Sequence, residues 1–385
     1  MKVLQTIAGF GLKSGGPTTC TYNLISAINE IEQSLNVEIL TPDPNSSDDR
    51  LVGLGEDWIK HVKNDTFTPL DFSNNINRFL NEKDYDIYHT NGLWKYINHK
   101  TCDVAREKSK PYIITTHGML YRTALNRSSW KKSILRKIWF DHDIMDASCI
   151  HATCDQEMVE IREYGYLGPI AVIGNPVEIP EYTHSLIVNH SYHRNRTTIG
   201  FLGRIHPIKR IENILEALNL LRNENVEFCI IGSGDASYER TIHSLVVQYN
   251  LEKNVHFFGF LNGKEKFETL AKLDCLFVPS DMENFGMIVP EALIVGTPVM
   301  ASLGTPWTKL NDEHCGWWCD NSPETIAKII AEVGDASADK LAQMGHNGRE
   351  YIIRKFSAVE VAKQMLELYR WINGEVSQPS FVYTI

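Results

Sequence analysis

Residues 276–291 read LFVPSDMENFGMIVPE. The apolar run Leu276–Pro279 ends at turn-forming residues, which is typical of a buried parallel strand. Pro290 suits the first turn of a helix, where its missing N–H has no partner in any case. The pattern therefore predicts a strand, then a loop that carries Glu283, then a helix whose first turn carries Glu291. In open α/β folds this carboxyl edge of the sheet is where ligands bind.

The same alternation of apolar runs and helical periodicity extends along the chain. In the first half the runs are Val3–Ala8, Val37–Leu40, Ile87–Thr90, Tyr112–Thr116 and Cys149–Thr153; in the second half they are Thr198–Leu202, Val226–Ile231, Val255–Phe258, Leu276–Pro279 and Pro298–Ala301. Such alternation predicts parallel α/β sheets. Two sets of runs in 385 residues predict two Rossmann-like domains.

The segment 175–197 holds two prolines and several histidines but little periodicity, so we expect the domain boundary near residue 185. The expected domains are residues 1–185 and 186–355, and the C-terminal helices at about 356–385 are expected to pack back on the first domain.

Composition excludes several classes of protein. A formal charge of -10 and a pI of about 5.8 disfavour a nucleic-acid binder. The eight cysteines show no zinc-ligand spacing, so we expect buried, reduced thiols. The longest apolar stretch, 287–301, contains a carboxylate and two prolines, so no segment is expected to span a bilayer. We expect a cytoplasmic protein, either soluble or peripheral at the inner face of the cell membrane.

Two loops carry groups suited to phosphate. Gly15 and Gly16 follow the first expected strand and precede a helix, where backbone N–H groups can approach a phosphate, although a plain strand-to-helix turn is about equally consistent. The spacing fits neither the dinucleotide nor the P-loop motif. After the first strand of the second half, Arg204 and Lys209 could clamp a diphosphate, because arginine offers forked donors and lysine a mobile charge.

Two histidines follow expected strands in the first half. His117 precedes Gly118, which permits close approach of a ligand, so a ligand-binding role and a structural role both stay open. For His89 we favour the structural role.

A basic run with interleaved apolar residues indicates an amphipathic helix after residue 122. Its face for an acceptor or an anionic membrane would comprise Arg127, Trp130, Lys131, Lys132, Arg136 and Lys137. An ordinary solvated helix face is the alternative.

In combination, these motifs resemble the retaining glycosyltransferases of family 4. The resemblance runs in order over nearly the whole chain and includes the Gly15-Gly16 loop, residues 89–94, 117–120 and 150–153, residues 203–209, the E-x7-E element 283–291, and residues 304–307 and 315–318. The subgroup it resembles makes bacterial surface polysaccharides. The resemblance implies the GT-B fold, in which two Rossmann-like domains face each other across a cleft.

The resemblance also implies roles for individual residues. Arg204 and Lys209 match the pair that holds the donor diphosphate, and Glu291 matches the glutamate that contacts the ribose. Glu283 is expected near the donor sugar, and His117 matches the histidine that approaches it. The remaining expected donor contacts are the backbone amides of Phe285, Gly286, Met287 and Ile288 and, beside the base, Phe260 and Leu261.

The implied activity is transfer of a hexosyl group from a UDP or GDP sugar to a glycan or lipid-linked acceptor, with retention and without a metal ion or other cofactor. The first domain is expected to bind the acceptor and the second the donor. Two departures stand out: Asn91 replaces a family histidine, and Asn175-Pro176-Val177 replaces Asn-Gly-Val. An epimerase or phosphorylase of the same fold, and a non-catalytic sugar-nucleotide-binding protein, remain alternatives.

Overall fold

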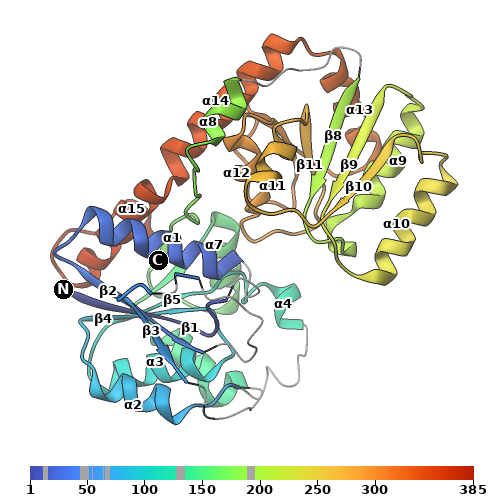
Figure 1. Cartoon of the computed structure of the whole chain (residues 1–385). Helices are drawn as coiled ribbons and strands as arrows, with labels where there is room; N and C mark the ends of the chain where they lie inside the picture. Colours follow the sequence, from blue (N-terminus) through green and yellow to red (C-terminus); the bar gives the residue numbers. More distant parts are fainter. Residues whose placement is uncertain are drawn as a thin grey trace. The chain divides into compact units, whose positions relative to one another are not determined.

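The computed structural model describes residues 1–11, 16–43, 52–53, 55–63, 65, 70–126, 135–188 and 196–385. The chain forms two compact units (Figure 1). Unit 1 comprises Met1–Pro176 and Ala358–Ile385, and unit 2 comprises Val177–Ser357. In the described part of the chain no helix has the length and apolar character of a membrane span.

Unit 1 is built on a sheet whose described strands run in the order β14-β7-β6-β5-β4-β1-β2-β3. The strands are β1 Lys2–Ile7, β2 Asn36–Pro42, β3 Ile59–Val62, β4 Ile87–Asn91, β5 Tyr112–Thr115, β6 Cys149–Ala152, β7 Ile170–Val172 and β14 Val382–Tyr383. All neighbours pair in parallel except β14, which is antiparallel to β7. This is the parallel sheet expected from the apolar runs.

Helices cover both faces of the unit 1 sheet. They are α1 Gly16–Ile31, α2 Asn74–Glu82, α3 Tyr96–Glu107, α4 Arg122–Asn126, the π-helix η2 Arg136–Phe140, α6 Asp141–Met145, α7 Asp155–Tyr164 and α15 Ala358–Ile372. Alternate residues of each strand point to opposite faces. Val3 and Ile113 therefore pack with α1 and α15, whereas Leu4 and Ile114 pack on the side of α2 and α3. Figure 1 shows α1 and the pair α2 and α3 on opposite sides of the strands.

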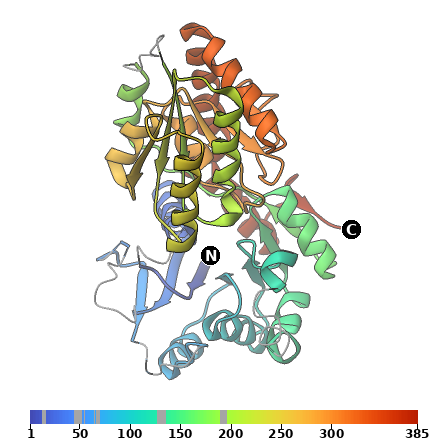
Figure 2. The same ribbon diagram turned by 90° about the vertical axis from the view of Figure 1, so that its right-hand side faces the viewer.

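Unit 2 has a second parallel sheet, of described strand order β10-β9-β8-β11-β12-β13. Its strands are β8 Thr197–Leu202, β9 Val226–Ile231, β10 Val255–Gly259, β11 Cys275–Val278, β12 Val299–Ser302 and β13 Gly316–Cys319. Its helices are α8 Thr183–Val188, the 3-10 turn η3 Pro207–Lys209, α9 Ile211–Leu221, α10 Ala236–Gln248, α11 Gly263–Leu270, α12 Ile288–Ile294, α13 Pro323–Asp335 and α14 Ala338–Phe356. One core joins the sheet to α9, α10 and α13, and another joins its opposite face to α11, α12 and α14. Figure 2 shows helices on both sides of these strands.

The chain enters unit 2 earlier than the expected boundary near residue 185. The Val177 N–H donates to the Phe356 carbonyl at 2.7 Å, and Val177 forms a parallel bridge with Ser357. Its side chain is buried in the unit 2 core. These contacts explain why the division falls at Pro176, and why the chain leaves unit 2 again after Ser357.

Candidate active site

The loops after β8 and β11 meet at the carboxyl edge of the unit 2 sheet. These strands are adjacent and parallel, with Ile199 opposite Cys275, so their following loops lie at the same edge. The loops are tied by the Asp281 N–H, which donates to the Ile208 carbonyl at 2.8 Å, and by Arg210 Nε, 2.6 Å from Asp281 Oδ2. The arrangement brings the basic loop and the E-x7-E element together.

Lys209 and Glu283 form an ion pair between these loops. Lys209 Nζ contacts Glu283 Oε1, and the Ser280 hydroxyl donates to the same oxygen at 2.9 Å. Only 16% of the Lys209 side chain and 13% of the Glu283 side chain are exposed. The Glu283 N–H donates to the Gly304 carbonyl at 2.8 Å, which fixes the loop from the β12 side. The lysine expected to hold a diphosphate is thus paired with a carboxylate of the E-x7-E element.

Arg204 differs from Lys209 in that its side chain is exposed. It follows Gly203 at the end of β8, and within the described residues it makes no hydrogen bond or ion pair. The loop is held by its backbone: the Ile205 N–H donates to the Ser233 carbonyl at 3.1 Å. A Cβ on Gly234 would lie 2.1 Å from the Ile205 carbonyl oxygen, so this approach requires glycine. Arg204 is therefore a cation free to take an anionic ligand.

Glu291 lies in the first turn of α12 and pairs with Lys266 of α11. Their Nζ and Oε1 atoms are 2.7 Å apart, and about a fifth of each side chain is exposed. Sequence reasoning missed Lys266, because Lys264 and Lys266 both fit the solvent-facing pattern of the helix and only the fold shows which one meets Glu291.

The residues between the two glutamates divide into core and backbone roles. The Phe285 side chain is buried against Trp307 and Phe356, with ring centroids 5.2 and 5.5 Å apart. Gly286 has φ +74°, a conformation that favours glycine. Met287 and Ile288 are partly buried against the same core. For Phe285, Gly286, Met287 and Ile288, the polar groups that can contact a ligand are therefore those of the backbone.

Phe260 and Leu261 follow β10, the edge strand of the sheet. Phe260 is 72% exposed, whereas Leu261 packs partly against the core. An exposed aromatic ring beside the carboxyl edge is a surface on which a planar base can stack.

In unit 1, His117 lies in a tight turn directly after β5. His117 has φ +48° and Gly118 has φ +75°. A histidine in the left-handed region is uncommon and points to a constraint from its surroundings. Burial, together with neighbouring His151, lowers the pKa of His117 to about 3. His117 is therefore neutral at physiological pH.

Glu157 holds this turn in place. Its side chain is almost fully buried near the start of α7 and accepts hydrogen bonds from the Thr116 hydroxyl at 2.6 Å and from the Gly118 N–H. The N–H and hydroxyl of Thr153 both donate to its other oxygen at 2.7 Å. Sequence reasoning missed Glu157, although a glutamate three positions after a helix cap is a recognised capping signal.

The other expected residues of unit 1 are placed as follows. His89 is buried, with Tyr369 Oη 2.9 Å from its Nδ1 and Thr115 Oγ1 2.7 Å from its Nε2, which is a structural setting. Burial holds the pKa of His89 well below its usual value. Gly16 begins α1, whereas Gly15 lies outside the described residues.

The expected basic face is described only at its end, because Arg127, Trp130, Lys131 and Lys132 lie outside the described residues. Arg136 has structural partners: its Nε is 2.8 Å from Tyr164 Oη and 3.2 Å from Asp141 Oδ1. Lys137 is exposed. The described part of this segment is the π-helix η2.

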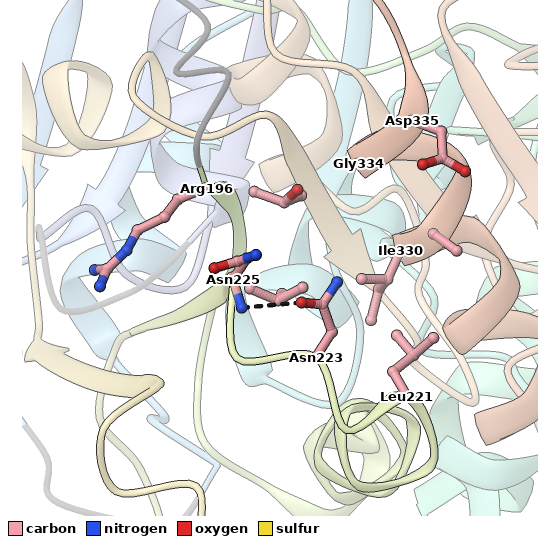
Figure 3. Close-up of a pocket in the computed structure, with 10 residues that line it drawn as sticks. Arg196, Leu221, Asn223, Asn225, Ile330, Gly334 and Asp335 are labelled. Atoms are coloured by element: carbon pink, nitrogen blue, oxygen red, sulfur yellow. Dashed lines mark hydrogen bonds between the residues drawn. The ribbon is translucent and has the colours of Figure 1, made fainter.

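A pocket at the opposite edge of the unit 2 sheet does not belong to this site (Figure 3). It lies where β8 and β9 begin, and the labelled side chains around it in Figure 3 are Arg196, Leu221, Asn223, Asn225, Ile330 and Asp335. Arg196 is paired with Glu227, and the Asn225 N–H donates to Asn223 Oδ1 at 2.9 Å. Ligands of open α/β sheets bind at the other edge, where the glutamate loops lie.

Two family models match consecutive parts of the chain. Residues 15–176 match the Glycosyl transferase 4-like domain, and residues 188–351 match Glycosyl transferases group 1. The first match lies within unit 1 and the second within unit 2.

Similar proteins carry glycosyltransferase names. A D-inositol 3-phosphate glycosyltransferase of Corynebacterium efficiens is 25% identical over 62% of this chain and 60% of its own length. WcaL of Escherichia coli, named for colanic acid biosynthesis, is 26% identical over 43% of each chain. The matched segments thus span less than two thirds of either relative.

The fold also matches solved structures. The Anabaena protein HepE, solved in complex with UDP and glucose, has a TM-score of 0.70 and 17% identity, over 96% of this chain and 99% of that chain. At this identity the likeness establishes the GT-B fold alone.

Proposed function

We propose that this chain, whose two units are those of a GT-B-type glycosyltransferase, transfers a hexosyl group with retention from a nucleotide-diphosphate sugar to a glycan or lipid-linked acceptor. The observation that supports this most is the meeting of Arg204, Lys209 and Glu283 at the carboxyl edge of the unit 2 sheet. Two cations there suit a diphosphate leaving group.

In the proposed reaction, the bond between the anomeric carbon and the diphosphate oxygen breaks, and the diphosphate leaves with the electron pair. The acceptor hydroxyl oxygen forms the new bond on the same face of the sugar, and its proton passes to the leaving diphosphate. Arg204 and Lys209 stabilise the charge that develops on that group, which is commonly the largest contribution available to an enzyme. The proposed chemistry uses no metal ion because these side chains supply the positive charge.

Lys209 has to be shared between Glu283 and the diphosphate. Because both side chains are mostly buried, donor binding would extend an existing ion pair into a three-membered network. Glu283 would then orient Lys209 and accept a hydrogen bond from a hydroxyl of the donor sugar. Glu291, oriented by Lys266, would accept hydrogen bonds from the ribose hydroxyls. The name of WcaL supports an acceptor in surface polysaccharide synthesis.

The experiment is a donor screen in two stages. Thermal shift with a panel of UDP and GDP sugars should show one nucleotide that stabilises the protein by about 2.7 kcal/mol at a hundred times its Kd. Nucleotide release from that donor, measured with and without glycan or lipid-linked acceptors, then identifies the reaction. Release that depends on an acceptor and yields an α-linked product from an α-linked donor supports retaining transfer. Isomerised donor would favour an epimerase, consumption of free phosphate a phosphorylase, and binding without turnover a non-catalytic protein.

A further inference from the structure

A chain of buried hydrogen bonds links His117 to the Ile173 carbonyl. We call it the His117 network; its members between these ends are His151, Thr115, His89, Tyr369, Gln5 and Asn91, none of them more than 7% exposed. The members come from β1, β4, β5 and β6 and, through Tyr369, from the returning helix α15.

The Ile173 end sets the direction of the first hydrogen bonds. His151 Nε2 lies 2.8 Å from the Ile173 carbonyl oxygen, which only accepts, so Nε2 carries the proton. Burial lowers the pKa of His151, so its ring is neutral and Nδ1 accepts from the Thr115 hydroxyl at 2.8 Å. Thr115 has a single hydroxyl proton, and it therefore accepts from His89 Nε2 at 2.7 Å.

The direction continues through Tyr369 to Asn91. Neutral His89 accepts at Nδ1 from the Tyr369 hydroxyl at 2.9 Å, and Gln5 Nε2 donates to that hydroxyl oxygen at 2.7 Å. Asn91 Nδ2 donates to Gln5 Oε1 at 2.8 Å. The Thr6 carbonyl supports the same orientation of the Asn91 amide, because Asn91 Nδ2 also donates to this carbonyl oxygen at 3.4 Å. The Asn91 amide oxygen therefore points to His117.

We propose that this network holds His117 in the neutral tautomer with its proton on Nε2, so that Nδ1 presents a lone pair to a ligand. The His117 Nε2–H group donates a hydrogen bond to Asn91 Oδ1 at 3.4 Å, which makes Asn91 the positioning residue. Within the described residues Nδ1 has no partner, and His117 lines a small cavity with Cys20 and Asn175.

The tautomer determines which ligand group His117 recognises. A lone pair accepts a hydrogen bond from a hydroxyl and repels a phosphate oxygen. This last step rests on the proposed function: His117 would accept from a hydroxyl of the donor sugar or of the acceptor, and it would not bind the diphosphate.

The tautomer can be measured without any substrate. The full chain is labelled with ¹⁵N-histidine, and a long-range ¹H–¹⁵N spectrum is recorded at pH 7.5. The His117 signals, identified by their absence from the spectrum of His117→Gln, are expected to show a protonated Nε2 and an unprotonated Nδ1. Asn91→Leu removes the acceptor and should give both tautomers. Asn91→Asp loses the Nδ2 donor to Gln5 but keeps an acceptor oxygen for His117, and it should therefore keep Nε2 protonated. Protonation of wild-type His117 at Nδ1, or an unchanged spectrum in Asn91→Leu, would overturn the proposal.

Tyr166→Phe is the control for losing a buried hydrogen bond that lies outside the His117 network. Tyr166 is as buried as the network tyrosine, but its hydroxyl donates to the Ala147 carbonyl at 2.8 Å, outside the network. This variant should lose stability and keep the wild-type His117 spectrum. An Nε2–H tautomer in a chain that transfers no sugar would overturn the proposed function and leave the network intact.

The hydroxyl is identified by paired kinetics. Deoxy donors and deoxy acceptors, each lacking one hydroxyl, are compared with wild-type protein and His117→Ala. The analogue that lacks the partner hydroxyl should lose about tenfold in kcat/KM with the wild type, the effect of one hydrogen bond, and little with His117→Ala. Equal losses in both proteins for every analogue would overturn the hydroxyl assignment.

Discussion

Lys209 and Glu283 are 74 positions apart in sequence and form an ion pair at one edge of the unit 2 sheet. The pair exists because β8 and β11 are neighbours and each is followed by a loop that turns toward the other. Removing either partner therefore does two things: it changes the charge offered to a ligand, and it leaves a mostly buried charge without its counterion.

Lys209→Ala should reduce transfer about a hundredfold, corresponding to the loss of about 3 kcal/mol of stabilisation of the leaving diphosphate. Rates of nucleotide release measure the effect, and circular dichroism checks that the fold is kept. Lys328→Ala is the control, because Lys328 is a 78% exposed lysine of unit 2. Near-normal turnover in Lys209→Ala would contradict the assignment of this lysine.

Glu283→Gln should separate binding from turnover. The amide can still accept from Ser280, but it no longer neutralises Lys209, so the nucleotide diphosphate should bind a few-fold more tightly. Transfer should fall about tenfold or more because the sugar loses a charged acceptor. Calorimetry with UDP and GDP gives the first quantity and kcat the second. Weaker diphosphate binding in this variant would show that Glu283 supports the phosphate site in another way.

The lysine beside Glu291 offers a test within a single helix. Lys266→Met should raise KM for the donor about tenfold with little change in kcat, because Glu291 loses the cation that orients it toward the ribose. Lys264→Met, two residues earlier on α11 and 65% exposed, is the matched control. Equal effects of the two substitutions would remove any special role for the Lys266 pair.

Much of the fold can be predicted from the sequence, because long apolar runs identify the inner strands. The run Val226–Ile231 coincides with β9, and the run Thr198–Leu202 differs from β8 by one residue. Short strands such as β7 and the edge strand β14, with three and two residues, carry too few side chains to show a period.

The candidate site shows the same limit. Motifs indicate which loops carry the chemistry, but ion pairs such as Lys266 with Glu291, and the route of the His117 network through Tyr369, depend on which elements become neighbours. That information lies in the tertiary packing of α11 on α12 and of α15 on the unit 1 sheet, and no local pattern contains it.

Glu157→Gln should destabilise unit 1 and also disturb the turn that carries His117. An amide offers one acceptor oxygen, and its NH₂ group would face donors, so hydrogen bonds to a buried charge are lost at a cost of about 3 kcal/mol. Urea unfolding measures the loss, and the His117 signals report the turn. Glu163→Gln, at a 44% exposed position of the same helix, should change neither.

Unit 1 should lose stability in mild acid because it buries neutral histidines. The pKa values of His89 and His117 are lowered by burial, so the folded chain resists protonation of these rings while the unfolded chain binds protons near pH 6.5. The stabilisation is thus present above pH 6.5 and is lost as pH falls toward the folded pKa values. Neighbouring titratable groups act on these rings in two ways. His151 lowers the pKa of both His89 and His117, and Glu157 raises the pKa of His151 itself.

Between pH 6.5 and 5 the expected loss is on the order of 1.5 kcal/mol for each of these two histidines. Chemical denaturation at pH 7.5, 6.5, 5.5 and 5.0 measures the slope. His89→Gln should flatten it by one histidine's share, because the amide does not titrate, while His346→Gln, at an exposed position of unit 2, should leave it unchanged. A slope that is the same in wild type and His89→Gln would mean that His89 is not held neutral in the folded protein.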